Sequence, residues 1–424
     1  MTKRGEFESL LGNITATPAE FAGGRSTAKS KTKRSRRLRG NVTELDDGIS
    51  EKAVLHELRR AKARLRRNPS LFSGDPDGYF TYDDPILSVT AYVYQSHLLM
   101  SSALGLAGDD GENLRNETFW QWARTGIHMW LSRNDKAFQT LMGMTPEAAI
   151  PVEKETIRIA VVGDAGFRGF AQRSVIEAIE ARHREMPFDF VIHLGDIYFA
   201  GSRAEMLKNF LAPFRKAGPR VLTLVGNHDL YFGGEPFLDA LDDLQQPSRY
   251  FAVENAHWRI ACLDTALPAQ TLRRSAGLLD KGQLAWLDKR LALKDSRKTV
   301  LMSHHFAVSG WKASSQGLQR QLSRHFGRIF SWYWGHEHAC AVYDKRTAGF
   351  DGACVGNGAF LESWTMPTRT PLPKWYARGR CSCYEPTSKF WPHGYLELEL
   401  RPEGISESYH LEGGESYNRI LPRT

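Results

Sequence analysis

The chain has 424 residues, of which 42% are hydrophobic and 25% are charged, and its formal net charge is +8. This composition excludes a wholly disordered chain, and the length allows two or three domains or one large catalytic domain with accessory regions. Residues 25–39 contain eight Lys or Arg and no Asp or Glu, which equals the whole net charge. The basic character therefore belongs to an N-terminal arm and not to the body of the protein.

Residues 1–47 show no hydrophobic periodicity and are predicted to form a disordered basic arm. Contact of this arm with nucleic acid or with an anionic membrane is the alternative to a solvated tail. The N-terminus lacks the apolar segment of a secretory signal, and the five cysteines have no zinc-ribbon spacing. Free thiols in a reducing compartment are the simplest interpretation, so we expect a cytoplasmic protein.

Residues 48–150 are expected to form a helical accessory region. Residues 51–67 combine an apolar stripe with a basic face, which predicts a helix docked on the body, with a membrane surface as the alternative. Residues 85–108 approach the length of a membrane span, but their polar residues favour a buried helix. Residues 116–131 carry aromatic side chains at helical spacing and show no sign of chemistry.

Short apolar runs alternate with amphipathic segments from Thr156 onwards, so residues 151–424 are predicted to form the catalytic domain. This alternation is typical of an α/β fold with buried strands. Helices are expected at residues 171–184, 204–216 and 280–293, and the tail at residues 394–418 is expected to form strands. In the tail, Leu396, Leu398 and Leu400 alternate with Glu397 and Glu399, which is the period of a half-buried strand. The buried strands are expected at residues 157–162, 190–194, 221–225, 259–263, 299–303 and 329–334.

A polar cluster follows each of five of these strands directly. The clusters are Gly163-Asp164-Ala165-Gly166, Gly195-Asp196-Ile197-Tyr198, Gly226-Asn227-His228-Asp229, Ser303-His304-His305 and Gly335-His336-Glu337-His338. Sites in such sheets gather beyond the carboxyl ends of the strands. Carboxylates and imidazoles crowded at one edge need a partner, and a bound cation supplies it. Carboxylate, amide and imidazole ligands suit Zn²⁺, Mn²⁺ or Fe better than Ca²⁺, and the set is large enough for two ions.

The five clusters resemble the motifs of calcineurin-like metallophosphoesterases, and the first is similar to that of the purple acid phosphatase branch. The resemblance covers about residues 156–358 and implies a four-layer α/β/β/α sandwich around two mixed sheets, preceded here by the helical region. It also implies two transition-metal ions (Mn, Zn or Fe) that activate a water for cleavage of a phosphate ester. The implied ligands are Asp164 and His338 for the first ion, Asn227, His304 and His336 for the second, and Asp196 as a bridge.

Two further residues of the third cluster receive catalytic roles. His228 is the expected acid, which protonates the leaving alcohol or binds the phosphoryl group. Asp229 is expected to orient His228, as carboxylates behind an active-site histidine often do.

The first metal position departs from the family pattern. Many members have His where this chain has Gly166, and the purple branch has a ligand Tyr where this chain has Phe199. Tyr198 lies one place earlier, and in an extended segment neighbouring side chains point to opposite faces. A weakly bound ion, a water ligand and rescue by Tyr198 are the alternatives, and we do not expect a purple ferric chromophore.

The leading function is hydrolysis of a phosphomonoester or a phosphodiester. A nuclease or a cyclic-nucleotide phosphodiesterase is the alternative within enzymes, and the basic arm would suit a nucleic-acid substrate. A binding or scaffold protein with a degraded first metal position is the alternative outside enzymes, motivated by Gly166 and Phe199. The substrate is not determined by the scaffold, because specificity lies in loops such as residues 232–246 and 307–323.

Overall fold

The computed structural model describes most of the chain after residue 135. The described residues there are 136–166, 170–198, 201, 203–230, 233–269, 277–310, 316–360, 372–377, 392–414 and 416–423. Before them, the described positions are 5, 8–9, 59–60, 62–67, 72–74 and 80–82. The chain divides into two compact units, Met1–Leu131 and Ser132–Thr424.

In the first unit, residues 59–60 and 62–67 are helical, as the pattern of residues 51–67 predicted. Two short strands, β1 (Phe72–Gly74) and β2 (Phe80–Tyr82), pair antiparallel. Residues 85–108, residues 116–131 and nearly all of the basic arm lie outside the described residues. In the described part of the chain, no helix combines the length and the apolar character that a membrane span requires.

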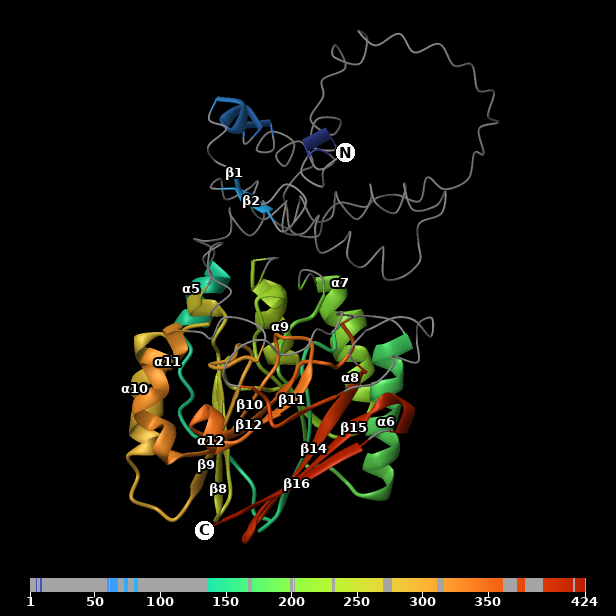
Figure 1. The fold of residues 1–424 in the computed structure, drawn as a ribbon, viewed down its shortest axis with the longest axis vertical. Helices are drawn as coiled ribbons and strands as arrows, with labels where there is room; N and C mark the ends of the chain where they lie inside the picture. Colours follow the sequence, from blue (N-terminus) through green and yellow to red (C-terminus); the bar gives the residue numbers. More distant parts are fainter. Residues whose placement is uncertain are drawn as a thin grey trace, which may run out of the picture. The chain divides into compact units, whose positions relative to one another are not determined.

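The second unit contains two mixed β-sheets (Figure 1). The strand order of the eight-stranded sheet is β13 (Trp375–Tyr376), β11 (Cys340–Tyr343), β12 (Asp351–Val355), β10 (Ile329–Trp334), β9 (Lys298–Ser303), β8 (Trp258–Leu263), β7 (Phe251–Glu254) and β3 (Ile150–Pro151). The order of the six-stranded sheet is β16 (Ser416–Pro422), β15 (Gly404–Leu411), β14 (Gly394–Arg401), β4 (Ile157–Val162), β5 (Phe190–His193) and β6 (Arg220–Thr223). All the strands that the sequence predicted are present, and their ends coincide with the prediction or differ from it by one or two residues.

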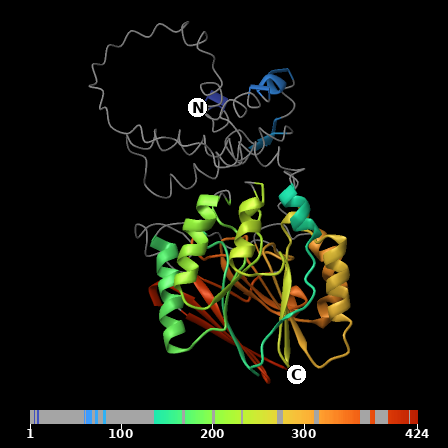
Figure 2. The same ribbon diagram turned by 180° about the vertical axis from the view of Figure 1, so that it is seen from behind.

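Helices cover the outer face of each sheet, which completes the four layers that the sequence analysis expected. Figure 1 shows α10 (Lys281–Leu291) and α11 (Gln316–Leu322) on one side of the paired sheets and α6 (Phe170–Glu185) and α8 (Ala212–Lys216) on the other, and Figure 2 shows the same layers from behind. The other helical segments are α5 (Lys136–Gly143), α7 (Arg203–Glu205), η4 (Met206–Leu211), η5 (His228–Leu230), α9 (Glu235–Asp243), η6 (Leu267–Ala269), η7 (Ser323–Arg328), α12 (Lys345–Ala348) and η8 (Glu412–Gly414).

The two faces of β4 explain how the layers hold together. Ile157, Ile159 and Val161 belong to the core between the two sheets, whereas Ala160 and Val162 belong to the core under α6 and α9. Alternate residues of a strand point to opposite faces, so β4, which is apolar at every position except Arg158, is buried on both sides. The continuous apolar runs in the sequence are therefore the strands at the centre of the sandwich.

The tail differs from its predicted pattern at one position. Leu396, Leu398 and Leu400 of β14 are buried as expected. Glu397, which alternates with them, is also buried and accepts hydrogen bonds from Arg182 of α6. A half-buried strand was expected, but α6 covers the second face of β14 and supplies the charge that Glu397 needs.

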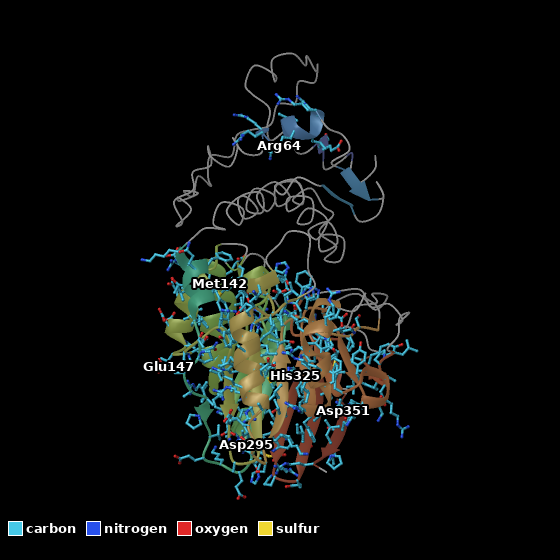
Figure 3. All side chains as sticks on the ribbon, turned by 90° about the vertical axis from the view of Figure 1, so that its left-hand side faces the viewer. Arg64, Met142, Glu147, Asp295, His325 and Asp351 are labelled. Carbon is cyan, nitrogen blue, oxygen red and sulfur yellow. The ribbon has the colours of Figure 1, made fainter. Side chains whose placement is uncertain are left out.

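The amino ends of the parallel strands lie at one end of this unit. Figure 3 shows the unit from the side of α10 and α11, with Asp295, just before β9, at one end and Met142 of α5 at the other. The polar clusters follow the carboxyl ends of the strands, so they lie at the end away from Asp295. The three cysteines among the described residues, Cys262, Cys340 and Cys354, are free and buried.

Candidate functional site

The predicted ligands of the second metal position come together around His304. The Nε2 atom of His304 lies 3.2 Å from Asn227 Oδ1, 3.2 Å from His336 Nδ1 and 3.4 Å from Asp196 Oδ1. The other ring nitrogen, Nδ1, donates to the Leu194 carbonyl at 2.9 Å. That bond directs Nε2 toward the other donors, as is usual for a histidine that binds a metal.

The predicted ligands of the first position also come together, and Tyr198 lies among them. His338 Nε2 is 3.4 Å from Asp164 Oδ1. The Tyr198 hydroxyl lies 2.8 Å from Asp164 Oδ1, 3.0 Å from Asp196 Oδ2 and 2.8 Å from His338 Nε2. Asp196 thus turns one carboxylate oxygen toward each group, which is the arrangement that a bridging ligand needs.

The position of Tyr198 corrects the argument from strand alternation. Asp196 has a φ of 71°, so the backbone is left-handed there and the rule for extended segments does not apply. The Tyr198 amide donates to the Gly166 carbonyl at 3.0 Å, and a Cβ on Gly166 would lie 2.4 Å from the Ile197 Cα. The backbone of Gly166 thus packs directly on the backbone of Ile197 and Tyr198. This contact leaves no room for a side chain at position 166, and it holds the loop that brings Tyr198 into the site. Phe199 lies outside the described residues.

Backbone strain is concentrated at the predicted ligands. Five residues other than glycine have positive φ among the described residues, and four of them are Asp164, Asp196, His336 and His338. Such conformations cost about 1–3 kcal/mol each and persist where the surroundings hold them for a function. The strain therefore falls on four of the residues that the motifs had indicated.

Glycines beside the ligands leave space for the carboxylates. A Cβ on Gly226 would lie 2.1 Å from Asp196 Oδ1, and a Cβ on Gly335 would lie 2.6 Å from Asp164 Oδ2. Gly356 contributes in the same way, because its Cβ would lie 2.8 Å from Asp164 Oδ2. No local pattern indicates this role for Gly356, since nothing in the sequence shows that the chain after β12 returns to the first cluster.

The electrostatics of the site favour a cation. Asp164 and Asp196 are almost completely buried, which is costly for carboxylates without a positive partner. Burial alone would lower the pKa of His304, but the charges of Asp196 and Asp164 raise that pKa to about 9. Burial alone would raise the pKa of Asp196, but the imidazoles of His304 and His228 hold it well below its usual range. The carboxylates thus attract positive charge to the point where the imidazole, amide and phenol groups meet.

Asp229 ties two of the motif loops together. Its carboxylate accepts hydrogen bonds from the backbone amides of Asp196 at 3.1 Å, Ile197 at 2.6 Å and Gly226 at 2.7 Å. Burial and the charge of Asp196 raise the pKa of Asp229 to about 7, against the lowering effect of these amides. The sequence analysis expected Asp229 to orient His228 and missed this backbone role, which no spacing rule reveals.

His228 lies at the border between the two groups of ligands. Its backbone amide donates to Asp196 Oδ1 at 2.9 Å, and its ring centre lies 4.5 Å from that of Tyr198. The side chain therefore lies beside the first group and within the same site. The structure brings together all eight residues that the sequence analysis singled out.

The donor set fits transition-metal ions. Two groups of residues place potential ligand atoms within 4.8 Å of one another: Asp164, Asp196 and His304 form one, and His304, His305 and His336 form the other. Buried carboxylates and imidazoles that need a cation, without thiolates, suit Zn²⁺, Mn²⁺ or Fe.

The comparisons with known proteins agree with this chemistry. The family model described as calcineurin-like phosphoesterase matches residues 157–340. A 3',5'-cyclic adenosine monophosphate phosphodiesterase, CpdA of Escherichia coli K12, is 32% identical over 218 residues, which cover 47% of this chain and 72% of that protein.

Two solved structures are also similar. A GAP50 protein, the anchor in the inner membrane complex of Plasmodium, is 14% identical with a TM-score of 0.48 and covers 63% of this chain and 89% of its own. A dimetal phosphatase from Danio rerio is 15% identical with a TM-score of 0.44 and covers 62% of this chain and 99% of its own. Both TM-scores are below 0.5, so the assignment rests on the family match and the bacterial relative. The chain belongs to the calcineurin-like phosphoesterase family and is a hydrolytic phosphoesterase.

Proposed function

We propose that the protein hydrolyses a phosphodiester or phosphomonoester at a binuclear metal centre. The observation that carries the proposal is Asp196, whose Oδ1 faces His304 and whose Oδ2 faces Tyr198, so that one buried carboxylate joins two groups of donors. The proposed donors are Asp164, Asp196, His338 and Tyr198 at the first position and Asp196, Asn227, His304 and His336 at the second.

The residues of the chain have distinct tasks in this proposal. When bound, the ions neutralise phosphoryl oxygens and lower the pKa of a bound water toward about 7, which supplies a nucleophile at neutral pH. His228 protonates the leaving oxygen or binds the phosphoryl group from beside the first position. Asp229 holds the loops that carry Asp196 and Asn227 at a constant separation through its three amide contacts.

A cyclic nucleotide is the substrate class that we favour among diesters. CpdA bears this activity in its name, and this chain aligns with 72% of its length. A nuclease is the second candidate, because residues 25–39 carry eight Lys or Arg and no acidic residue. The two candidates can be separated by replacing the basic residues of that segment with Gln. If the substrate is a cyclic nucleotide, the variant should hydrolyse it at the wild-type rate. If the substrate is a nucleic acid, the variant should bind it more weakly, and its binding should depend less on salt concentration.

The test combines metal analysis with a substrate panel. Purified protein loaded with Zn²⁺, Mn²⁺ or Fe²⁺ is expected to hold two ions per chain and to hydrolyse cyclic AMP, a bis-aryl phosphate or an aryl phosphate. The variants Asp196→Asn and Asn227→Ala should abolish turnover, because each removes a donor from the centre. Asp242→Asn, at an exposed position, is the matched control and should keep full activity.

Two results would reject the proposal. Full activity in Asp196→Asn would show that the reaction does not use this site. A wild-type protein that takes up no transition metal and hydrolyses no ester of the panel would favour the binding or scaffold alternative.

A further inference from the structure

A third imidazole lies against the second metal position. His305 follows His304 directly, and its side chain is 1% exposed. Its ring centre lies 4.9 Å from that of His304 and 4.5 Å from that of His336. One potential ligand atom from each of the three histidines lies within 4.8 Å of the other two.

Thr265, which follows β8, fixes the orientation of His305. The Thr265 hydroxyl oxygen accepts a hydrogen bond from the His305 backbone amide at 3.0 Å, and it lies 3.0 Å from the ring atom Nδ1. Because Nδ1 lies beside this hydroxyl, Nε2 is the ring atom to consider as a metal donor. His304 has the same pattern, because its Nδ1 donates to a carbonyl while its Nε2 meets the other donors. A hydrogen bond at the second ring nitrogen is the usual support of a metal-binding histidine.

Crowding supports this orientation. The ring centres of the three imidazoles lie 4.5–5.0 Å apart, with His304 and His305 buried and His336 partly buried. Imidazole nitrogens gathered at this spacing can serve together as ligands of one cation. Gly277 packs on the other side of His305, where a Cβ would lie 2.5 Å from the His305 Cβ, so the ring has little room to turn away.

We propose that His305 is a further ligand of the second ion through Nε2, with Thr265 as its positioning residue. This inference rests on the proposed function, since it adds a donor to the same centre. The second position then offers three imidazoles beside one amide oxygen and one carboxylate. Such a nitrogen-rich set favours Zn²⁺ over Mn²⁺, which prefers oxygen donors. His305 thereby makes the second position selective for Zn²⁺.

The experiment measures metal affinity and does not depend on turnover. Metal-free protein is titrated with Zn²⁺ and with Mn²⁺ against a chromophoric chelator, and bound metal is counted after gel filtration. His305→Ala is expected to lower the affinity for one of the two Zn²⁺ ions at least tenfold and to change the affinity for Mn²⁺ much less. Thr265→Val keeps the imidazole and the shape of the threonine, and it should weaken the same ion about 10- to 100-fold.

A matched control and the folded state complete the design. His325→Ala removes another buried histidine, which pairs with Asp288 at 2.7 Å, and should leave both ions at wild-type affinity. Thermal unfolding identifies any variant that fails to fold. If His305→Ala fails to fold, the metal affinity of Thr265→Val decides the test.

The outcomes separate this inference from the proposed function. If both His305→Ala and Thr265→Val bind two Zn²⁺ ions with wild-type affinity, His305 is not a ligand, and the binuclear centre still stands. If the wild-type protein binds no Zn²⁺ but takes up another transition-metal ion, the inference fails and the binuclear centre still stands. If it takes up no transition-metal ion, the centre itself is wrong and the inference fails with it. If His305→Ala lowers the affinities for Zn²⁺ and Mn²⁺ by the same factor, His305 does not make the second position selective for Zn²⁺.

Discussion

Replacement of Glu397 by Gln tests how the buried charge in β14 stabilises the fold. The Glu397 side chain is 6% exposed and pairs with Arg158, with Arg182 at 2.8 Å and with His410 at 3.0 Å. Burial alone would raise its pKa, but the hydrogen bonds from His410, Arg182 and Arg158 lower the pKa from 4.5 to about 2. This lowering corresponds to about 3 kcal/mol in favour of the ionised folded state.

The sign of the pH dependence follows from the lowered pKa. The contribution is fully present above about pH 4.5, where the unfolded carboxyl is also ionised, and is lost as the pH falls toward 2. Glu397→Gln, which keeps the shape of the side chain, should therefore reduce the free energy of unfolding by about 3 kcal/mol at pH 7. The difference between variant and wild type should shrink as the pH falls below 4.5.

Urea denaturation at pH 7, 4.5 and 3 measures this difference. Glu399→Gln is the control, because Glu399 pairs only with the half-exposed Arg401 among its described ion pairs and should contribute about 0–1 kcal/mol. A loss in Glu397→Gln that is equal at all three pH values would refute the reasoning, since the cost would then be one of packing and not of ionisation.

Three further predictions concern the site. Gly226→Ala places a Cβ 2.1 Å from Asp196 Oδ1 and should lower turnover about 100-fold by displacing that carboxylate; near-normal kinetics would contradict the crowding. Tyr198→Phe should lower the affinity of the first position for its ion about tenfold or more, as measured by chelator competition. An unchanged affinity would show that the hydroxyl is not a donor. His228→Ala should lower turnover about 10²- to 10⁴-fold while metal content stays near two ions per chain; an equal loss of both would make the residue structural.

The local pattern of the sequence determined the strands, the helices between them and the residues of the site. Runs such as residues 157–162, which are apolar except for Arg158, are typical of a central strand that is buried on both faces. Polar residues at the ends of those runs indicate the site, since the carboxyl ends of parallel strands share one edge. Asp196 and His304 could thus be identified from their positions alone.

The tertiary structure decided what depends on contacts between distant segments. Leu398 of β14 pairs with Ile159 of β4, although most of the sequence of the second unit separates these two residues. No local pattern reveals this neighbour or the helix that buries Glu397. Tyr198 enters the site because Asp196 adopts a left-handed backbone against Gly166. Periodicity describes the faces of regular elements, whereas side-chain direction in a strained loop is set by the segments that pack on it.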